Sequence, residues 1–261
     1  MTAVQASAGQ VVAVTGGASG IGAACVRLFA GRGDRVFALD VDESSARALC
    51  DASPGVHFVR VDVADAGSVG AAFATIAGAA GRLDVLVNSA GVESRALLST
   101  IADAAWDRVL DVNLKGTMLC TRAAIPLMKP RGGSIVNIAS VAGKRMSFSG
   151  DVAYTASKGG VLAFTRHAGY ELAPDGIRVN AVCPGPTLTP MIERNLSRER
   201  MDALARTVPL GRWVRPEDVA QAVAFFAGPG AAMCTGGSLD VDGGVMVSNG
   251  GRYEDYFAGR G

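Results

Sequence analysis

Short apolar runs alternate with segments of helical periodicity along most of this chain. The first run, at residues 11–15, is rich in valine and ends at two glycines, which is typical of a buried parallel strand that enters a turn. Apolar residues spaced by about 3.6 positions then occupy residues 21–30 and stop at Gly31, which predicts a helix. The chain therefore begins with a strand, a tight turn and a helix.

The same unit repeats toward the other end of the chain. Further strands are predicted at residues 35–40, 56–61, 83–88, 134–140, 177–182 and 238–241, and helices at residues 43–50, 68–80, 104–128, 152–173 and 216–227. This alternation predicts an α/β fold, a Rossmann-like doubly wound parallel sheet of about seven strands with helices on both faces. Because ligands bind at the carboxyl ends of such strands, residues that carry chemistry are expected directly after the strands.

No linker or internal repeat divides residues 1–261, so we expect a single dinucleotide-binding and catalytic domain. Two segments of this domain differ from the repeating pattern of strands and helices. Residues 186–213 break the alternation and are expected to form a substrate loop. Residues 245–261 are expected to form a C-terminal tail whose aromatic side chains, Tyr253, Tyr256 and Phe257, pack on a neighbouring subunit; a free tail is the alternative.

Composition and charge exclude several classes of protein. Hydrophobic residues make up 49% of the chain and charged residues 19%, so the chain can bury a core and is not of the disordered class. The formal net charge of +1 gives no basic excess for binding nucleic acid. No apolar run reaches the roughly 18 residues of a membrane span, and the first residues lack a basic leader, which favours a soluble, cytoplasmic protein.

Metal and disulfide chemistry are not indicated either. The five cysteines are widely spread and form no C-x-x-C pair, which favours reduced thiols over a disulfide framework or a zinc ribbon. His57 and His167 have no third ligand spaced near them. We therefore expect no metal site.

The segment TGGASGIG, residues 15–22, follows the first strand and opens the first helix. Glycines at such a turn let backbone N–H groups approach a pyrophosphate, which the positive end of the helix also attracts. Asp40 ends the second predicted strand, where an acid can accept hydrogen bonds from the adenosine ribose. Because a carboxylate there repels a 2′-phosphate, NAD is favoured over NADP. The alternative is that Asp40 only caps the next helix.

Tyr154 and Lys158 lie on one face at the start of the predicted helix 152–173. An ammonium about 4 Å from a phenol can lower the pKa of the phenol by about three units. Tyr154 could then exchange protons near neutral pH. Ser140, at the end of the strand 134–140, belongs at the same edge of the sheet. A solvated surface pair is the alternative, and the combination with Ser140 argues against it.

Taken together, these segments and several others resemble the short-chain dehydrogenase/reductase family over nearly the whole chain. The motifs are TGGASGIG at residues 15–22, Asp62-Val63, NSAG at 88–91, NLKG at 113–116, SIVNIAS at 134–140, YTASK at 154–158 and CPGPTLT at 183–189. One position departs from the family pattern, since Ser89 stands where the family has a second asparagine. The departure leaves Asn88 and Gly91 in place.

This resemblance implies roles for individual residues. Tyr154 would be the general acid/base, and Lys158 would bind the nicotinamide ribose and lower the pKa of Tyr154. Ser140 would hydrogen-bond the substrate oxygen, and Asn113 would hold a water that links Lys158 to solvent. The implied cofactor contacts are Gly16, Ser19, Gly20, Ile21, Gly22, Asp40, Asp62, Val63, Asn88, Ala90, Gly91, Tyr154, Lys158, Pro184, Gly185, Thr187 and Thr189.

The resemblance also implies a reaction. We expect an oxidoreductase that transfers a hydride between NAD and a secondary alcohol of the cyclic, aromatic or hydroxyacyl type. The alternatives are a 3-oxoacyl thioester reductase, which usually uses NADPH, and a catalytically silent family subunit or scaffold. Asp40 argues against the first, and the joint presence of Tyr154 and Lys158 against the second. A homotetramer is expected, in which helices 104–128 and 152–173 pair across twofold axes.

The substrate pocket is expected between residues 92–97, 141–151 and 188–213. These segments carry apolar side chains at Met146, Phe148, Met191, Ile192 and Trp213 and cations at Arg95, Lys144, Arg145 and Arg194. This mixture fits a hydrophobic or cyclic alcohol and leaves open an acid or a thioester carrier on the substrate.

Overall fold

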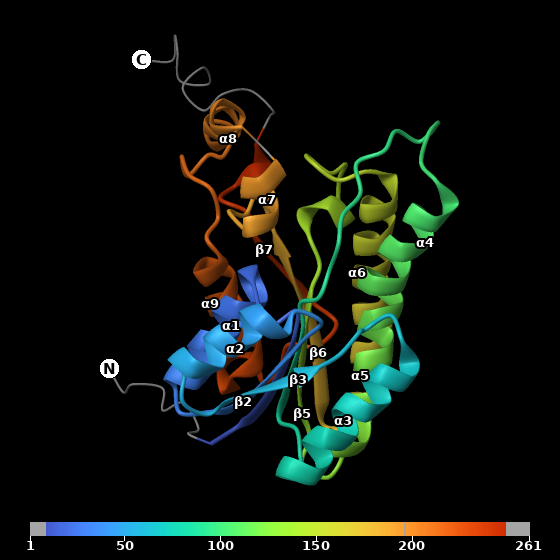
Figure 1. Cartoon of the computed structure of the whole chain (residues 1–261), viewed down its shortest axis with the longest axis vertical. Coiled ribbons are helices and arrows are strands. Elements are labelled where there is room, and N and C mark those ends of the chain that lie inside the picture. Colours follow the sequence, from blue (N-terminus) through green and yellow to red (C-terminus); the bar gives the residue numbers. More distant parts are fainter. Residues whose placement is uncertain (1–8, 196, 249–261) are drawn as a thin grey trace.

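A seven-stranded parallel sheet forms the centre of the structure, a computed structural model that describes residues 9–195 and 197–248 (Figure 1). The strands are β1 (Val11–Thr15), β2 (Arg35–Asp40), β3 (Val56–Arg60), β4 (Val85–Asn88), β5 (Gly133–Ile138), β6 (Ile177–Pro184) and β7 (Ser238–Val241). Their order is β3-β2-β1-β4-β5-β6-β7, with every neighbouring pair parallel. The predicted α/β fold class is confirmed.

Helices cover both faces of this sheet. They are α1 (Gly20–Gly31), α2 (Glu43–Ala52), α3 (Ala66–Ala80), α4 (Asp103–Leu110), α5 (Gly116–Met128), α6 (Val152–Glu171), α7 (Pro190–Asn195), α8 (Arg198–Ala205) and α9 (Pro216–Ala227). Helices α1, α2 and α9 lie on one face and α3, α5 and α6 on the other (Figure 1).

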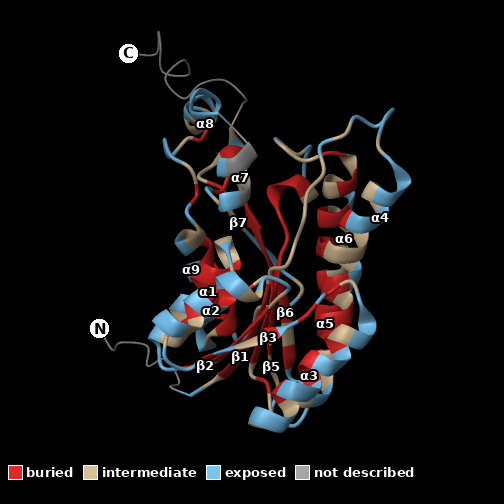
Figure 2. Cartoon of the chain, in the orientation of Figure 1, coloured by how far each residue is buried: buried red, intermediate tan, exposed pale blue. Residues whose placement is uncertain are grey.

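Side chains of each central strand alternate between these two layers. Val12 and Val14 of β1 pack with Phe29 on the α1 side, whereas Ala13 between them packs with Ile76 on the α3 side. Because both faces are covered, the central strands β1 and β4 are buried throughout (Figure 2). This burial explains why the sequence shows continuous apolar runs instead of an alternating pattern.

The single long helix predicted at residues 104–128 has an interruption. Helix α4 ends at Leu110, a π-helical turn spans Asp111–Lys115, and α5 begins at Gly116. The Thr117 hydroxyl donates to the Asn113 carbonyl oxygen over 2.8 Å, which gives that carbonyl a partner inside the widened turn. Asn113 itself is buried. The turn is a feature that helical periodicity alone does not predict.

The strand order reverses beside β1, and this reversal fixes where a ligand can bind. β1 pairs with β2 on one side and with β4 on the other. The chain leaves β1 toward β2 on one side and leaves β4 toward β5 on the other side. These opposite directions open a crevice at the carboxyl ends of β1 and β4. Segment 186–213, predicted as a substrate loop, contributes α7 and α8 close to this edge (Figure 1).

The C-terminal tail can be followed only in its first residues. Val245–Val247 form a 3-10 turn in which Val245 is buried. The three tail aromatics, Tyr253, Tyr256 and Phe257, lie outside the described residues, as do the side chains of Met191 and Arg194. The predicted packing of the tail on a neighbouring subunit thus stays a prediction. In the described part of the chain, no helix is long and apolar enough to span a membrane.

Candidate active site

A cleft of about 1200 Å³ opens at the carboxyl ends of the strands. The predicted site residues that line it are Gly16, Ser19, Gly20, Ile21, Asp40, Asp62, Val63, Ala90, Gly91, Ser140, Tyr154, Lys158, Pro184, Gly185, Thr187 and Thr189. They come from loops that are far apart in sequence. The segments that follow the strands therefore meet at the carboxyl edge of the sheet, as the parallel arrangement predicts.

The turn between β1 and α1 shapes one end of the cleft. Gly16 has φ +64°, and a Cβ there would lie 2.8 Å from the Ala90 Cα. A Cβ on Gly22 would lie 2.0 Å from the Gly16 carbonyl oxygen. Ser19, the N-cap residue of α1, makes no side-chain cap hydrogen bond. The first N–H groups of the helix are therefore free of a side-chain cap and fit an anion such as a pyrophosphate.

Asp40 is fixed at the end of β2 by two backbone groups. Its Oδ2 accepts from the Ala18 N–H and its Oδ1 from the Asp42 N–H, both over 3.0 Å. The cap of α2 is Asp42, whose side chain accepts from the Ser45 N–H. Asp40 therefore does not cap the helix, and its carboxylate lines the cleft.

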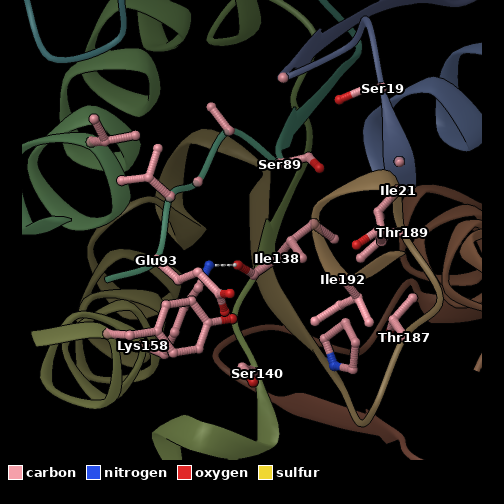
Figure 3. A pocket seen from close by; sticks show the side chains of 18 of the residues that line it. Ser19, Ile21, Ser89, Glu93, Ile138, Ser140, Lys158, Thr187, Thr189 and Ile192 are labelled. Atoms are coloured by element: carbon pink, nitrogen blue, oxygen red, sulfur yellow. Dashed lines mark hydrogen bonds between the residues drawn. The ribbon is translucent and has the colours of Figure 1, made fainter. Parts of the chain in front are cut away.

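The opposite end of the cleft holds Ser140, Tyr154 and Lys158. Figure 3 shows Ser140 and Lys158 at this end, away from Ser19. The Lys158 Nζ donates to the Ile138 carbonyl oxygen over 2.8 Å and lies 5.7 Å from the centre of the Tyr154 ring. Burial lowers the pKa of Lys158 to about 8, because the charged ammonium loses hydration.

The phenol of Tyr154 departs from the sequence-based expectation. Burial raises its pKa to about 12, a hydrogen bond with Ser140 opposes this rise, and the charge of Glu93 adds to it. We expected Lys158 to lower this pKa. In the structure the Lys158 ammonium hydrogen-bonds the Ile138 carbonyl oxygen, and a nearby carboxylate and burial both favour the neutral phenol.

Three predicted site residues do not line the cleft. Gly22 packs so closely against the Gly16 carbonyl oxygen that a Cβ would not fit there. Asn88 is buried, and its Nδ2 donates to the Thr121 hydroxyl and to Asn137 Oδ1. Its amide therefore belongs to a polar chain inside the sheet and not to the cleft surface.

Asn113, the third, holds the loop after β4. Its Oδ1 accepts from the Val92 N–H over 2.8 Å, and its Nδ2 donates to the Val92 carbonyl oxygen and the Ser157 hydroxyl. A Cβ on Gly91 would lie 3.4 Å from Asn113 Oδ1 and 3.7 Å from Lys158 Nζ. The Asn113 amide oxygen and the Lys158 ammonium therefore both face the space that a Cβ on Gly91 would occupy.

Glu93 and Asp151 lie in the expected pocket segments 92–97 and 141–151, but the sequence assigned neither residue an individual role. Glu93 lines the cleft, and Asp151 caps α6 by accepting from the Ala153 and Tyr154 N–H groups. Position was the available signal, since Glu93 follows directly after the NSAGV loop and Asp151 precedes the predicted helix 152–173.

Only some of the side chains expected in the substrate pocket line the cleft. Phe148, Ile192 and Trp213 line the cleft, whereas Met146 is exposed. Lys144 pairs with Asp240, and Arg145 stacks on the Phe148 ring at 4.9 Å. Lys144 and Arg145 are therefore engaged with protein groups.

Comparison with known proteins gives one family match and full-length relatives. A family profile described as enoyl-(acyl carrier protein) reductase matches residues 16–246. The chain is 44% identical to cis-4-hydroxycyclohexanecarboxylate dehydrogenase of Sinomonas cyclohexanicum, over 93% of this chain and 99% of that protein. It is 40% identical to the 3-oxoacyl-acyl-carrier-protein reductase FabG of Thermotoga maritima, over 92% and 98% of the two chains.

A solved structure agrees in fold over nearly its whole length. A variant of actinorhodin polyketide ketoreductase, crystallised with NADPH, superposes with a TM-score of 0.86 at 37% identity. The match covers 91% of this chain and 97% of that one.

Proposed function

This chain belongs to the short-chain dehydrogenase/reductase family of oxidoreductases, which bind a nicotinamide cofactor, and we propose that it is an NAD-dependent alcohol dehydrogenase. Its reaction would interconvert a secondary alcohol of the cyclic, aromatic or hydroxyacyl type and the matching ketone. The observation that carries this proposal is the meeting of Ser140, Tyr154 and Lys158 in one cleft with the glycine turn after β1.

In this proposal Tyr154 exchanges the proton of the reacting hydroxyl. During alcohol oxidation its phenolate oxygen takes that proton, and during ketone reduction its hydroxyl returns it. Ser140 donates a hydrogen bond to the same substrate oxygen. Bound in the cleft, the nicotinamide cofactor supplies the hydride acceptor for oxidation and the hydride donor for reduction.

The remaining residues bind and orient. Lys158 would bind the nicotinamide ribose, and Thr187 and Thr189 would bind the carboxamide and so select the ring face offered to the substrate. Asn113 supports the loop next to Lys158 through Val92. A water held by Asn113 as a proton path from Lys158 is part of the same proposal.

Asp40 supports NAD as the preferred cofactor. Its carboxylate lines the adenosine end of the cleft, and the backbone of Ala18 and Asp42 holds it there. An adenosine 2′-phosphate would bring a second negative charge to this position, and no basic side chain stands at Val41, Asp42 or Glu43 to receive it.

Reduction of 3-oxoacyl thioesters is the second candidate reaction. It is supported by the similarity to the Thermotoga maritima reductase. If that reaction uses NADPH here, it would require a 2′-phosphate beside Asp40, so the two candidates differ in cofactor as well as in substrate. A silent subunit or scaffold is disfavoured, since Tyr154 and Lys158 are both present in the cleft.

We also infer the setting in which the enzyme works. A single domain over residues 1–261 is supported by one sheet that contributes to both ends of the cleft. A homotetramer is supported by exposed apolar side chains on and near the sheet-covering helices, Tyr170, Phe225 and Met233. The five free cysteines fit the reducing cytoplasm.

A turnover screen tests the proposed function. Purified protein would be assayed with NAD and with NADP against cyclic alcohols, aromatic carbinols and hydroxyacyl thioesters. We expect NAD-linked oxidation of at least one secondary alcohol and its loss in Tyr154→Phe. Turnover of thioesters alone, with NADPH, would replace the proposal by the second candidate.

A further inference from the structure

One acidic side chain lies at the catalytic end of the cleft and takes no part in the proton and hydride transfer described above. Glu93 follows the loop after β4, lines the same cavity as Ser140 and Tyr154, and has a side chain only 9% exposed. Figure 3 shows Glu93 beside Lys158, away from the phosphate end at Ser19. A buried charge in a substrate pocket needs a partner or a function.

Protein groups hold this carboxylate in one orientation. Its Oε1 accepts from Arg95 Nε over 3.1 Å and from Arg95 Nη2 over 2.6 Å. Its Oε2 accepts from the Ser149 hydroxyl over 3.2 Å. Arg95 lies in the same loop as Glu93, whereas Ser149 comes from the segment that precedes α6, so the carboxylate is held from two segments of the chain. The carboxylate is therefore pre-oriented before a ligand binds.

Glu93 retains capacity to accept another hydrogen bond. A carboxylate offers about four acceptor positions, and groups of the described residues occupy two at Oε1 and one at Oε2. The fourth position belongs to Oε2, which accepts from the Ser149 hydroxyl. A hydroxyl group of a bound molecule can fill it.

Glu93 also lies close to the group that handles the proton. Its Oε2 accepts from the Ser149 hydroxyl, and a Cβ on the adjacent Gly150 would lie 2.8 Å from Cδ1 of the Tyr154 ring. A carbinol oxygen bound by Ser140 and Tyr154 would thus lie near Glu93. A substituent on the next carbon of the substrate comes within its reach.

Apart from Lys158, whose ammonium donates to the Ile138 carbonyl oxygen, the other described groups around this end do not favour a substrate anion. Val92, Val141 and Phe148 give the cleft apolar walls. Lys144 is paired with Asp240, and Arg145 stacks on Phe148. A carboxylate next to the reacting carbon would therefore meet the negative charge of Glu93.

We propose that Glu93 determines substrate specificity by accepting a hydrogen bond from a second hydroxyl on the carbon next to the reacting carbinol. The enzyme then prefers vicinal diols, and the matching α-hydroxy ketones, over monohydroxy alcohols, and it disfavours substrates with a carboxylate at that position. This inference rests on the proposed dehydrogenase function. A hydrogen bond to a charged acceptor predicts a preference of about ten- to a hundredfold.

Three ligands with one ring test the proposal in the unmodified enzyme. They are 1,2-cyclohexanediol, cyclohexanol and 2-hydroxycyclohexanecarboxylate, each titrated calorimetrically into enzyme with NADH and each assayed for NAD-linked oxidation. We expect the diol to bind at least tenfold more tightly than cyclohexanol and the hydroxy acid to bind most weakly. Equal affinity for diol and cyclohexanol, or tighter binding of the hydroxy acid than of the diol, would overturn the proposal.

Variants assign the effect to Glu93. In Glu93→Leu the diol-to-cyclohexanol affinity ratio should fall toward one, and in Glu93→Gln the amide oxygen should retain part of it while affinity for the hydroxy acid rises. Glu171→Leu, an exposed glutamate change on α6, is the matched control and should leave the three affinities unaltered. An unchanged ratio in Glu93→Leu would refute the role of Glu93.

The proposed dehydrogenase activity and the role of Glu93 are tested by different outcomes. If no alcohol is oxidised, the proposed function fails, while the binding ratios still decide the role of Glu93. If alcohols are oxidised but the ratios do not depend on Glu93, only the specificity proposal fails.

Discussion

Asp151 and Ser94 hydrogen-bond each other in both directions. The Ser94 hydroxyl donates to the Asp151 carboxylate, and the Asp151 N–H donates to the Ser94 carbonyl oxygen over 3.0 Å. The same carboxylate caps α6 by accepting from the Ala153 and Tyr154 N–H groups. The pair therefore joins the loop after β4 to the first turn of the helix that carries Tyr154.

We expect Asp151→Ala to weaken both stability and catalysis. Loss of an N-cap costs about 1–2 kcal/mol of unfolding free energy, and release of the loop from α6 should raise KM for the substrate. Denaturant unfolding and steady-state kinetics measure the two effects. Asp65→Ala removes the cap of α3, a helix that does not carry Tyr154, and should lower stability without changing KM for the alcohol. Equal kinetics in both variants would contradict a positioning role for Asp151.

Tyr154→Phe should reduce kcat by at least about a hundredfold, because general acid–base catalysis typically contributes that much. Affinity for NADH, measured by fluorescence titration, should stay close to that of the unmodified enzyme. Ser140→Ala should lose less activity, and Lys158→Ala should also weaken cofactor binding. Tyr170→Phe, an exposed position on the same helix, serves as the control. Retention of more than about a tenth of kcat in Tyr154→Phe would assign the proton to another group.

The third prediction concerns the choice between NAD and NADP, which we expect to depend on Asp40. The unmodified enzyme should show higher kcat/KM with NAD than with NADP, since the fixed carboxylate repels a 2′-phosphate. The double change Asp40→Ala and Val41→Arg should shift the ratio toward NADP by removing that charge and adding a cation. Asp51→Ala on α2 should leave the ratio as it is. Equal or better kcat/KM with NADP before any change would remove this interpretation.

Lys158 should make stability depend on pH. Burial lowers its pKa from 10.5 to about 8, so between these values the unfolded chain binds more protons than the folded one. The free energy of unfolding therefore rises with pH between about 8 and 10.5. Below pH 8 Lys158 is charged in the folded protein, and burial of that charge lowers the stability. Lys158→Met should accordingly stabilise the protein by up to about 3 kcal/mol below pH 8, less the hydrogen bond to Ile138.

This gain should shrink as the pH approaches 10.5. Denaturant unfolding of both proteins at pH 7 and near pH 10 measures it. Lys115→Met, which removes an exposed lysine paired with Asp111, should show no such pH-dependent difference. A gain that is independent of pH would show that burial does not perturb Lys158.

The fifth prediction concerns assembly. Light scattering at micromolar concentration should give four times the chain mass of 26.6 kDa. Exposed apolar side chains such as Tyr170 and Met233 would then be covered by other subunits. A monomer under these conditions would contradict the tetramer.

The sequence by itself determined the strands, most helices and the edge at which the chemistry gathers. Buried parallel strands need apolar residues on both faces, and this requirement is local enough to read from residues 11–15 onward. The parallel arrangement then brings the segments after β1, β2, β4 and β5 to one edge. Asp40, Ser140 and Tyr154 could therefore be assigned to a common cleft before any coordinates.

Only the tertiary structure decided where individual side chains point and which charges they meet. Asn88 hydrogen-bonds within the sheet, Asn113 in the π-helical turn hydrogen-bonds Val92, and Glu93 accepts a hydrogen bond from Ser149. These relationships join residues that are distant in sequence, and each depends on how helices pack on strands. Periodicity fixes the face of an element on which a residue lies. The hydration and the neighbours that set its pKa and hydrogen bonds arise when the elements pack together.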